Sequence, residues 1–250
     1  MSAPLLQLTG VTKTFGGIHA LSGMTSEVAE GRIVGIIGPN GAGKTTLFNV
    51  VTGALRADAG EICLNGSALT GQPPYRIVRK GIARTFQNIR LFASMTVWEH
   101  LLVAQPHGES WWRRLLPISW VDPAARARAE EVMNFFGLAG LRDRSAKSLP
   151  YGLQRKVEMA RAVTARPKLL LLDEPVAGMN HDEAEEIREL MLRLRATGLS
   201  ILLIEHDMNF VMRLCDYLYV LDFGVLIAEG TPEEIRRNPV VLDAYLGKDQ

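Results

Sequence analysis

Gly38-Pro-Asn-Gly-Ala-Gly-Lys-Thr-Thr46 is the stretch that decides the fold, because it fits the phosphate-binding pattern G-x-x-x-x-G-K-[ST]. The apolar run Ile33–Ile37 leads into it and predicts a strand, and residues 45–51 behind it predict the first turns of a helix. Glycines let the backbone curl so that successive N–H groups point into one concavity, where the helix N-terminus adds partial positive charge. The sequence therefore predicts a site for a nucleoside triphosphate.

The residue types of this loop have separate predicted parts. Lys44 would reach the β- and γ-phosphates, and the Thr45 hydroxyl would sit on Mg²⁺. An accidental match in a glycine-rich turn is the alternative, and the strand and helix on either side argue against it. The other predicted nucleotide contacts in the loop are Gly38, Pro39, Asn40, Gly41, Ala42, Gly43 and Thr46.

The composition is that of an ordinary globular domain: 250 residues, 47% hydrophobic and 22% charged. A net charge of +1 gives no electrostatic case for a nucleic-acid partner. The apolar runs are too short for a membrane helix, which needs about 18 residues, and residues 1–10 do not look like a signal peptide. Cys63 and Cys215 have neither metal nor disulfide spacing, which predicts buried thiols in a reducing compartment. We expect a cytosolic chain, which could still dock on a membrane protein.

The first hundred residues alternate between predicted strands, turns and short helices. Two strands are expected over Leu5–Phe15 and His19–Val28, and the Phe15 ring could either stack on adenine or cap the core. Gln87 follows a further predicted strand that begins at Ile82, and its side-chain carbonyl oxygen could face Mg²⁺ or the attacking water. From that residue alone a surface glutamine is the simpler interpretation. A short helix over 73–80, and a capping box at residues 96–99 that starts a helix to about 104, complete this part.

The segment from Pro106 to Pro123 changes in composition, because Trp111, Trp112 and Trp120 occur among arginines and prolines. It could form an amphipathic patch that touches a membrane protein or lipid headgroups. It could equally be an inserted helical hairpin whose tryptophans pack on their neighbours. Residues 122 and 123 then predict the N-cap and first position of a helix over 124–136.

Two adjacent carboxylates, Asp173 and Glu174, end the continuously apolar strand predicted over residues 169–173. Adjacent side chains at a strand end diverge, so they need different functions. One can hold Mg²⁺ through its water shell while the other orients and deprotonates the attacking water. An amphipathic helix is predicted before them over residues 156–165, and another strand over 199–206 terminates at His206.

Taken in order, these features resemble the nucleotide-binding subunits of ATP-binding cassette (ABC) transporters over essentially the whole chain. The resemblance makes Phe15 the adenine-stacking aromatic and Gln87 the Q-loop glutamine. It places residues 149–154 on the signature motif, which faces the ATP of the partner ATPase through Tyr151, Gly152 and Gln154. It also makes Lys44 and Gln87 part of the catalytic set.

The same resemblance gives the residues after the signature their expected roles. Asp173 becomes the Walker B aspartate, which with Thr45 and Gln87 completes the Mg²⁺ environment. Glu174 becomes the catalytic glutamate, and His206 the switch histidine that contacts the γ-phosphate.

The fold implied is an α/β P-loop NTPase with a mainly parallel sheet flanked by helices. An N-terminal antiparallel β subdomain and an inserted α-helical subdomain at about residues 88–165 belong to it. One ABC domain would span residues 1–250, with a short tail over 231–250.

Two positions depart from the family pattern. Pro150 stands where the phosphate-contacting serine is usual, and proline has neither the hydroxyl nor a backbone N–H. Asn180 replaces the usual aspartate of the D-loop, so the coupling between the two ATP sites is expected to differ. Neither departure touches the catalytic residues, so hydrolysis remains the expected activity.

Within the family, residues 84–92, 149–152, 204–208 and 237–247 are similar to the LivG-type ATPases of branched-chain amino-acid importers. This implies ATP and Mg²⁺ as cofactors, and a position at the inner face of the cell membrane. The implied partners are membrane permease subunits, an external solute-binding protein, and either a LivF-type ATPase or a second copy of this chain. Related importers carry urea, short amides or aromatic acids, so the sequence alone does not identify the cargo.

Two other interpretations compete with transport. A soluble cassette ATPase of DNA repair or translation would usually carry two fused cassettes or long insertions, which this chain lacks. A purely regulatory nucleotide-binding module would fit best without Lys44 or Glu174, and both are present.

Overall fold

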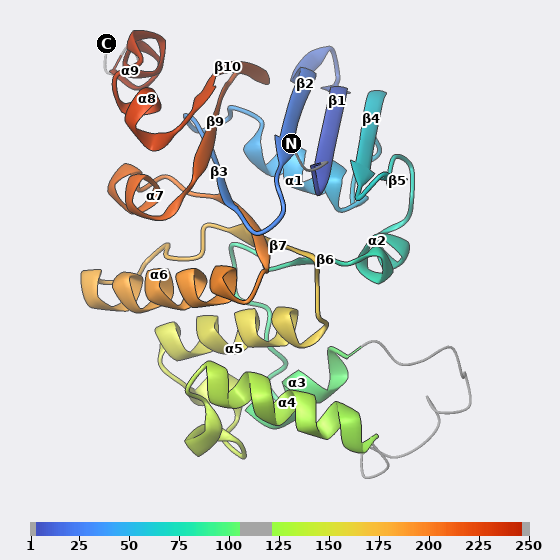
Figure 1. Cartoon of the computed structure of the whole chain (residues 1–250), viewed down its shortest axis with the longest axis vertical. Coiled ribbons are helices and arrows are strands. Elements are labelled where there is room, and N and C mark those ends of the chain that lie inside the picture. The colour runs from blue at the N-terminus through green and yellow to red at the C-terminus, as the bar shows by residue number, and fades with distance from the viewer. Residues whose placement is uncertain (1–3, 106–121, 247–250) are drawn as a thin grey trace.

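The computed structural model describes residues 4–105 and 122–246, and contains two sheets and a group of helices (Figure 1). The first sheet is antiparallel, with the strand order β2-β1-β4-β5. Its strands are β1 (Leu6–Phe15), β2 (Ile18–Val28), β4 (Ala59–Leu64) and β5 (Ser67–Ala68). This confirms the predicted N-terminal antiparallel part. The Trp-rich segment lies outside the described residues, so neither interpretation of it is tested.

The second sheet is the mainly parallel one, with the order β10-β9-β3-β8-β7-β6. Only β10, at one edge, runs antiparallel to its neighbour. Its strands are β3 (Ile33–Ile37), β6 (Ile82–Arg84), β7 (Leu169–Asp173), β8 (Ser200–Ile204), β9 (Tyr217–Asp222) and β10 (Val225–Gly230). This is the predicted P-loop NTPase arrangement.

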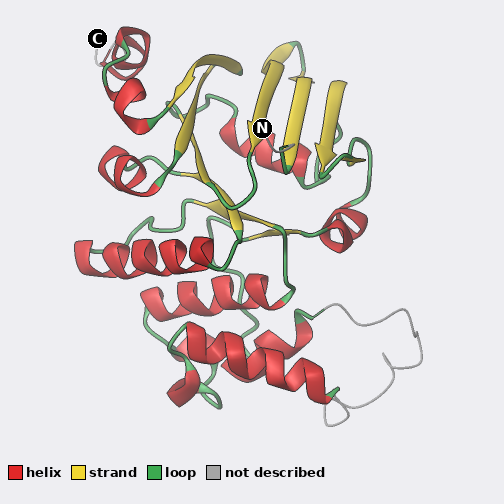
Figure 2. Ribbon diagram, in the orientation of Figure 1, coloured by secondary structure: helices red, strands yellow, loops and turns green. Residues whose placement is uncertain are grey.

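Helices cover the parallel sheet, and α3, α4 and α5 gather at the end of the molecule away from the antiparallel sheet (Figures 1 and 2). Two short 3-10 helices lie between α4 and α5, at Ala139–Leu141 and Ala146–Ser148. No helix in the described part of the chain has the length and apolar character to cross a membrane. The α-helices are α1 (Lys44–Val51), α2 (Pro74–Lys80), α3 (Val97–Val103), α4 (Pro123–Phe135), α5 (Tyr151–Thr164), α6 (His181–Ala196), α7 (Met208–Leu214), α8 (Pro232–Arg236) and α9 (Pro239–Leu246).

Alternation along the buried strands divides the interior into two cores. In β3, Ile33 and Ile37 belong to the core shared with α3–α7, whereas Val34 and Ile36 belong to the core shared with α1 and the antiparallel sheet. Successive side chains of a strand point to opposite faces, so a strand covered on both faces reads as continuously apolar. All five residues of β3 are buried, as this requires.

Several local predictions are confirmed, and two need correction. The capping box at Thr96 and Glu99 is present. Helix α5 begins at Tyr151 rather than at residue 156, because Pro150 forces an extended backbone on residue 149 and the helix starts directly behind it. The strand predicted to begin at Ile82 is present and is three residues long. Cys215 is buried as predicted, and its burial raises its pKa, but Cys63 is only half-buried.

His100 is a buried titratable residue of α3. Its ring is fully buried, with Nε2 accepting from the Phe92 backbone N–H at 2.9 Å and Nδ1 lying 2.8 Å from the Thr96 carbonyl. Only the neutral ring with its proton on Nδ1 satisfies both contacts. Burial is the main cause that lowers the pKa of His100 below its usual 6.5.

We therefore predict that stability contributed by neutral His100 is complete above about pH 6.5 and is lost as pH falls toward its lowered folded-state pKa. Thermal unfolding of the wild type should show a lower midpoint at pH 5.5 than at pH 7.5. His100→Leu should flatten that difference, whereas His181→Gln, at an exposed histidine, should not. An unchanged pH difference in His100→Leu would remove His100 as its cause.

Candidate active site

The site residues predicted in the phosphate loop and at the strand ends come together at the carboxyl ends of four neighbouring parallel strands. β3 leads into the loop that starts at Gly38, and β8 leads to His206. β7 ends at Asp173 and Glu174, and β6 leads toward Gln87. Because parallel strands share one carboxyl edge, residues far apart in the sequence meet there.

The loop before α1 is wrapped around the ammonium group of Lys44. This side chain is buried, and its Nζ donates to the carbonyl oxygens of Gly38 at 2.7 Å and Pro39 at 2.8 Å. A cavity of about 230 Å³ opens beside the loop. It is lined by Ala20, Asn40, Gly41, Ala42, Gly43, Lys44, Thr45, Thr46, Glu174 and His206.

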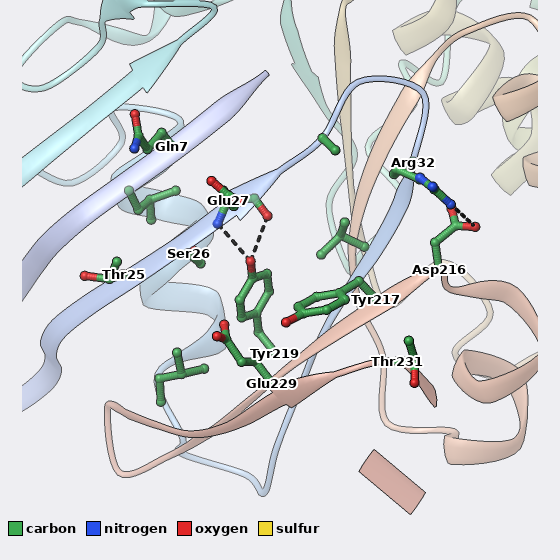
Figure 3. Close-up of a pocket in the computed structure, with 14 residues that line it drawn as sticks. Gln7, Thr25, Ser26, Glu27, Arg32, Asp216, Tyr217, Tyr219, Glu229 and Thr231 are labelled. Carbon is green, nitrogen blue, oxygen red and sulfur yellow. Dashed lines mark hydrogen bonds and ion pairs between the residues drawn. The ribbon is translucent and has the colours of Figure 1, made fainter. Parts of the chain in front are cut away.

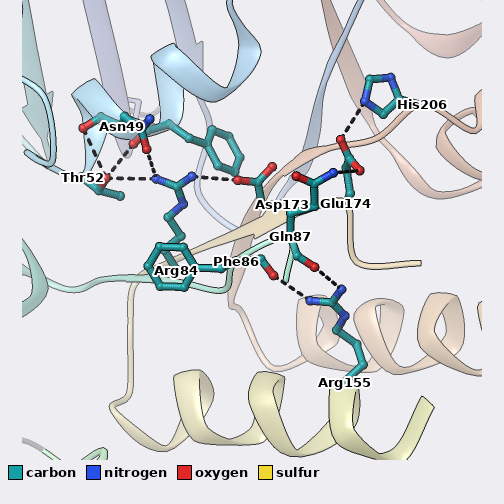
Figure 4. A network of polar contacts seen from close by, with 10 residues as sticks. Asn49, Thr52, Arg84, Phe86, Gln87, Arg155, Asp173, Glu174 and His206 are labelled. Atoms are coloured by element: carbon teal, nitrogen blue, oxygen red, sulfur yellow. Dashed lines mark hydrogen bonds and ion pairs between the residues drawn. The ribbon is translucent and has the colours of Figure 1, made fainter. Parts of the chain in front are cut away.

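Both oxygens of Glu174 are held by predicted site residues (Figure 4). Oε1 lies 2.8 Å from His206 Nε2, and Oε2 accepts from Gln87 Nε2 at 2.8 Å. An ionised carboxylate only accepts hydrogen bonds, so His206 carries its proton on Nε2 and Gln87 turns its amide nitrogen inward. The side-chain carbonyl oxygen of Gln87, Oε1, therefore stays available to a ligand.

Asp173 and Glu174 diverge, as their adjacent positions predict. Glu174 takes a left-handed backbone conformation, with φ of 47°, and its N–H donates to the Ile204 carbonyl at 2.9 Å. The Asp173 carboxylate instead receives Arg84 Nη2 at 2.7 Å on Oδ2. The two carboxylates thus have different side-chain partners.

Arg84 and Glu205 are site residues that the sequence reasoning missed. Glu205 is buried directly before His206 and accepts from the backbone N–H groups of His206 and Val176, both at 3.0 Å. Burial raises the pKa of Glu205, and these backbone donors oppose that shift. A charged residue placed directly at the end of an apolar strand was the available signal in both cases.

Arg155 links α5 to the loop that carries Gln87 (Figure 4). Its side chain is fully buried, and it donates to the carbonyl oxygens of Phe86 and Gln87, each at 2.8 Å. It also pairs with the equally buried Glu158 at 2.8 Å. The charge is therefore compensated inside the protein, which is what a buried guanidinium requires.

The predicted residues outside the loop and strand ends do not line this cavity. Phe15 is 45% exposed, which fits a ring available for stacking better than a core cap. Gln154 donates to the Leu149 carbonyl at 2.8 Å, closing the turn before α5. Gly152 faces Glu183 of α6, and Tyr151 is half exposed at the start of α5. Their contacts with nucleotide remain predictions.

A larger cavity, of about 720 Å³, lies between β2 and β9 (Figure 3) and contains none of the predicted residues. Tyr219 crosses it, since its hydroxyl both accepts from the Glu27 N–H and donates to the Glu27 carbonyl at 2.9 Å. Burial raises the pKa of Tyr219 to about 12, so this hydroxyl keeps its proton. The contact joins the two sheets.

Comparison with known proteins adds to this geometry. The family model described as "ABC transporter" matches residues 21–177. The chain belongs to the ABC transporter family. A second model, for branched-chain amino acid ATP-binding cassette transporters, matches residues 225–250. This ABC protein is an ATPase whose hydrolysis is coupled to transport.

Its relatives cover the whole chain. It is 44% identical to the high-affinity branched-chain amino acid transport ATP-binding protein BraF of Pseudomonas aeruginosa, over 99% of this chain and 100% of the relative. The same identity and coverage hold for LivG of Escherichia coli K12. Among solved structures, the ADP conformation of MJ1267, an ATP-binding cassette of an ABC transporter, matches with a TM-score of 0.88 at 36% identity, covering 99% of this chain and 100% of that one.

One departure from the ABC pattern has a structural explanation. Asn180 is the N-cap of α6: its side chain accepts from the Glu183 N–H at 2.9 Å, while the Glu183 carboxylate accepts from the Asn180 N–H at 3.1 Å. Asparagine is among the best N-cap residues, so the neutral side chain keeps the helix start intact.

Proposed function

We propose that this chain is the ATP-hydrolysing subunit of an importer for branched-chain amino acids, at the inner face of the cell membrane. The observation that carries the site assignment is Glu174, held between His206 and Gln87 at the edge of the Lys44 cavity. The cargo rests on the relatives, which are branched-chain amino acid transport proteins along their full length. Residues 231–250 would form the tail specific to this group.

ATP would bind with its phosphates in the loop around Lys44. The ammonium exchanges its two carbonyl contacts for phosphate oxygens, which are charged and form stronger hydrogen bonds. The exposed face of Phe15 stacks on adenine, and the backbone N–H groups of the loop and the start of α1 face the phosphates.

The donor set at this edge fits Mg²⁺. Thr45 supplies a hydroxyl, Asp173 a carboxylate and Gln87 a carbonyl oxygen, all hard oxygen ligands of the kind that this ion prefers beside phosphates. When bound, the ion neutralises charge on the β- and γ-phosphate oxygens.

Glu174 is then the group that orients the attacking water. It accepts a proton of that water as the oxygen attacks the γ-phosphorus and the bond to the β-phosphate oxygen breaks. His206 holds Glu174 from one side and Gln87 from the other, so the carboxylate is oriented before the nucleotide arrives. With ATP bound, the same His206 Nε2–H can turn from Glu174 to donate to the γ-phosphate.

The second half of each site would come from another ATPase. Tyr151, Gly152 and Gln154 at the start of α5 would face the ATP of a partner, which is a LivF-like ATPase or a second copy of this chain. Pro150 offers no N–H there, so Gly152 and neighbouring amides make the contact. ATP binding closes the pair and hydrolysis reopens it. The helical part at about residues 88–165 would follow this motion, and the Gln87 loop would contact the permease.

Co-purification tests this assembly. Tagged Glu174→Gln, extracted in gentle detergent with ATP, should recover two multi-span membrane proteins and a second small ATPase. The same preparation without nucleotide is the control for closure of the ATPase pair. Recovery of ribosomes or DNA-repair factors in place of membrane proteins would overturn the transport role of this subunit.

The cargo needs its own test on the reconstituted complex. Solute-binding protein loaded with leucine, isoleucine or valine should stimulate ATP hydrolysis. Stimulation by urea or an aromatic acid instead would keep the ATPase and overturn the cargo.

A further inference from the structure

The guanidinium of Arg84 joins three elements around Asp173 (Figure 4). Arg84 is the last residue of β6, and its side chain is only 9% exposed. Nη2 donates to Asp173 Oδ2 at the end of β7, at 2.7 Å. Nη1 donates to Asn49 Oδ1 of α1 at 2.7 Å and lies 3.4 Å from Thr52 Oγ1. The helix that follows the phosphate loop is thereby tied to the carboxylate through a single side chain.

Aromatic rings hold this guanidinium in place. Its central carbon lies 5.4 Å from the centre of the Phe48 ring and 5.2 Å from that of Phe86. Asp173 is itself 6% exposed, so both charges are largely withdrawn from water. Among the residues that the structure describes, no group forms a hydrogen bond with the buried Nε of Arg84. The planar guanidinium donates to two acceptors at once while it lies between two rings. The ammonium group of a lysine cannot reproduce this geometry.

We infer that Arg84 is a positioning residue for the metal-facing carboxylate, an inference that rests on the proposed binding of ATP with Mg²⁺. Arg84 holds Asp173 by Oδ2 alone. Within residues 4–105 and 122–246, the other oxygen, Oδ1, forms no hydrogen bond. It is therefore the oxygen that can accept hydrogen bonds from the water shell of the ion. The same fork sets the distance between Asp173 and α1, and therefore between the carboxylate and the phosphate loop.

The positioning role of Arg84 and its positive charge predict opposite effects on the affinity for Mg²⁺. If Arg84 only adds positive charge beside the site, its removal should favour Mg²⁺ and lower the concentration required. If Arg84 positions Asp173, its removal should raise that concentration, since partners that orient metal ligands typically contribute 10- to 100-fold in affinity. The sign of the effect therefore separates the two roles.

The test compares Arg84→Gln and Arg84→Lys with the wild type by following a fluorescent ATP analogue. Binding is measured first in EDTA, and then as a function of Mg²⁺ concentration. We expect Arg84→Gln to need about tenfold more Mg²⁺ for half-maximal effect, with metal-free binding changed by less than about twofold because backbone groups form the phosphate loop. Arg84→Lys should be intermediate, since it keeps the charge without the fork.

Arg195→Gln is the matched control, because Arg195 also pairs with an aspartate, Asp216 at 2.8 Å, far from the carboxyl edge of the sheet. Its Mg²⁺ requirement should equal that of the wild type. An equal or lower Mg²⁺ requirement in folded Arg84→Gln would overturn the inference. Should Arg84→Gln fail to fold, the same criterion applies to Arg84→Lys. A wild type whose binding ignores Mg²⁺ would instead overturn the metal assignment of the proposed function.

Discussion

Glu174→Gln is expected to lower ATP turnover by a factor of roughly 10² to 10⁴, the range that a positioned general base contributes. Glutamine keeps the shape of the side chain, and its carbonyl oxygen can still accept a hydrogen bond from one of the two donors. Its amide cannot take a proton from water. ATP binding should persist, because the Lys44 loop is untouched. The measurement is phosphate release under saturating ATP, with nucleotide affinity determined separately.

The control for this variant is Glu186→Gln on α6, where an exposed carboxylate pairs with Lys156. Its turnover should match the wild type. Should Glu174→Gln hydrolyse ATP at the wild-type rate, Glu174 would have no role as the base, and the contacts with His206 and Gln87 would be structural only.

Gly38→Ala is expected to disable the nucleotide site through the backbone. Gly38 has φ of 145°, and a Cβ placed there would lie 2.0 Å from the carbonyl oxygen of Leu221 in β9. That atom belongs to a sheet strand and cannot step aside, so the loop must move. We predict a loss of more than about 3 kcal/mol of folding free energy. ATP affinity should weaken by roughly 100-fold, or about 2.7 kcal/mol.

Gly41→Ala separates the clash from conformational strain. Gly41 also has a positive φ, of 81°, but nothing lies within 4 Å of the position of its Cβ. This variant should lose only the strain of the left-handed region, about 1–2 kcal/mol. Chemical denaturation and nucleotide titration of both variants provide the comparison. Equal losses in the two variants would show that the approach to Leu221 is unimportant.

The sequence predicted what depends on local pattern. The loop around Lys44 and the strand ends at Asp173 and His206 follow from residue type and apolar runs, and parallel pairing brings them to one edge. Arg84 escaped because its importance depends on the register that sets β6 against β7. The register between two strands cannot be predicted from a single sequence.

The start of α5 and the burial of Cys63 show a second limit. Helical periodicity indicates the amphipathic body of α5 but not the turn before it, where Pro150 sets the start. Cys63 lies on β4 with intermediate exposure, because one face of that strand is covered and the other is not. Burial of this kind is decided by neighbouring elements rather than by residue type.

Arg155 has a mechanical consequence for the ATPase. Its buried guanidinium grips the main chain at Phe86 and Gln87, and main-chain atoms offer no side-chain rotation to absorb a displacement. We therefore expect the Gln87 loop and the first turn of α5 to move together rather than independently. A displacement of the loop would then also shift Tyr151 and Gly152 at the start of α5. Shortening the Arg155 side chain should therefore loosen the connection between the Gln87 loop and α5.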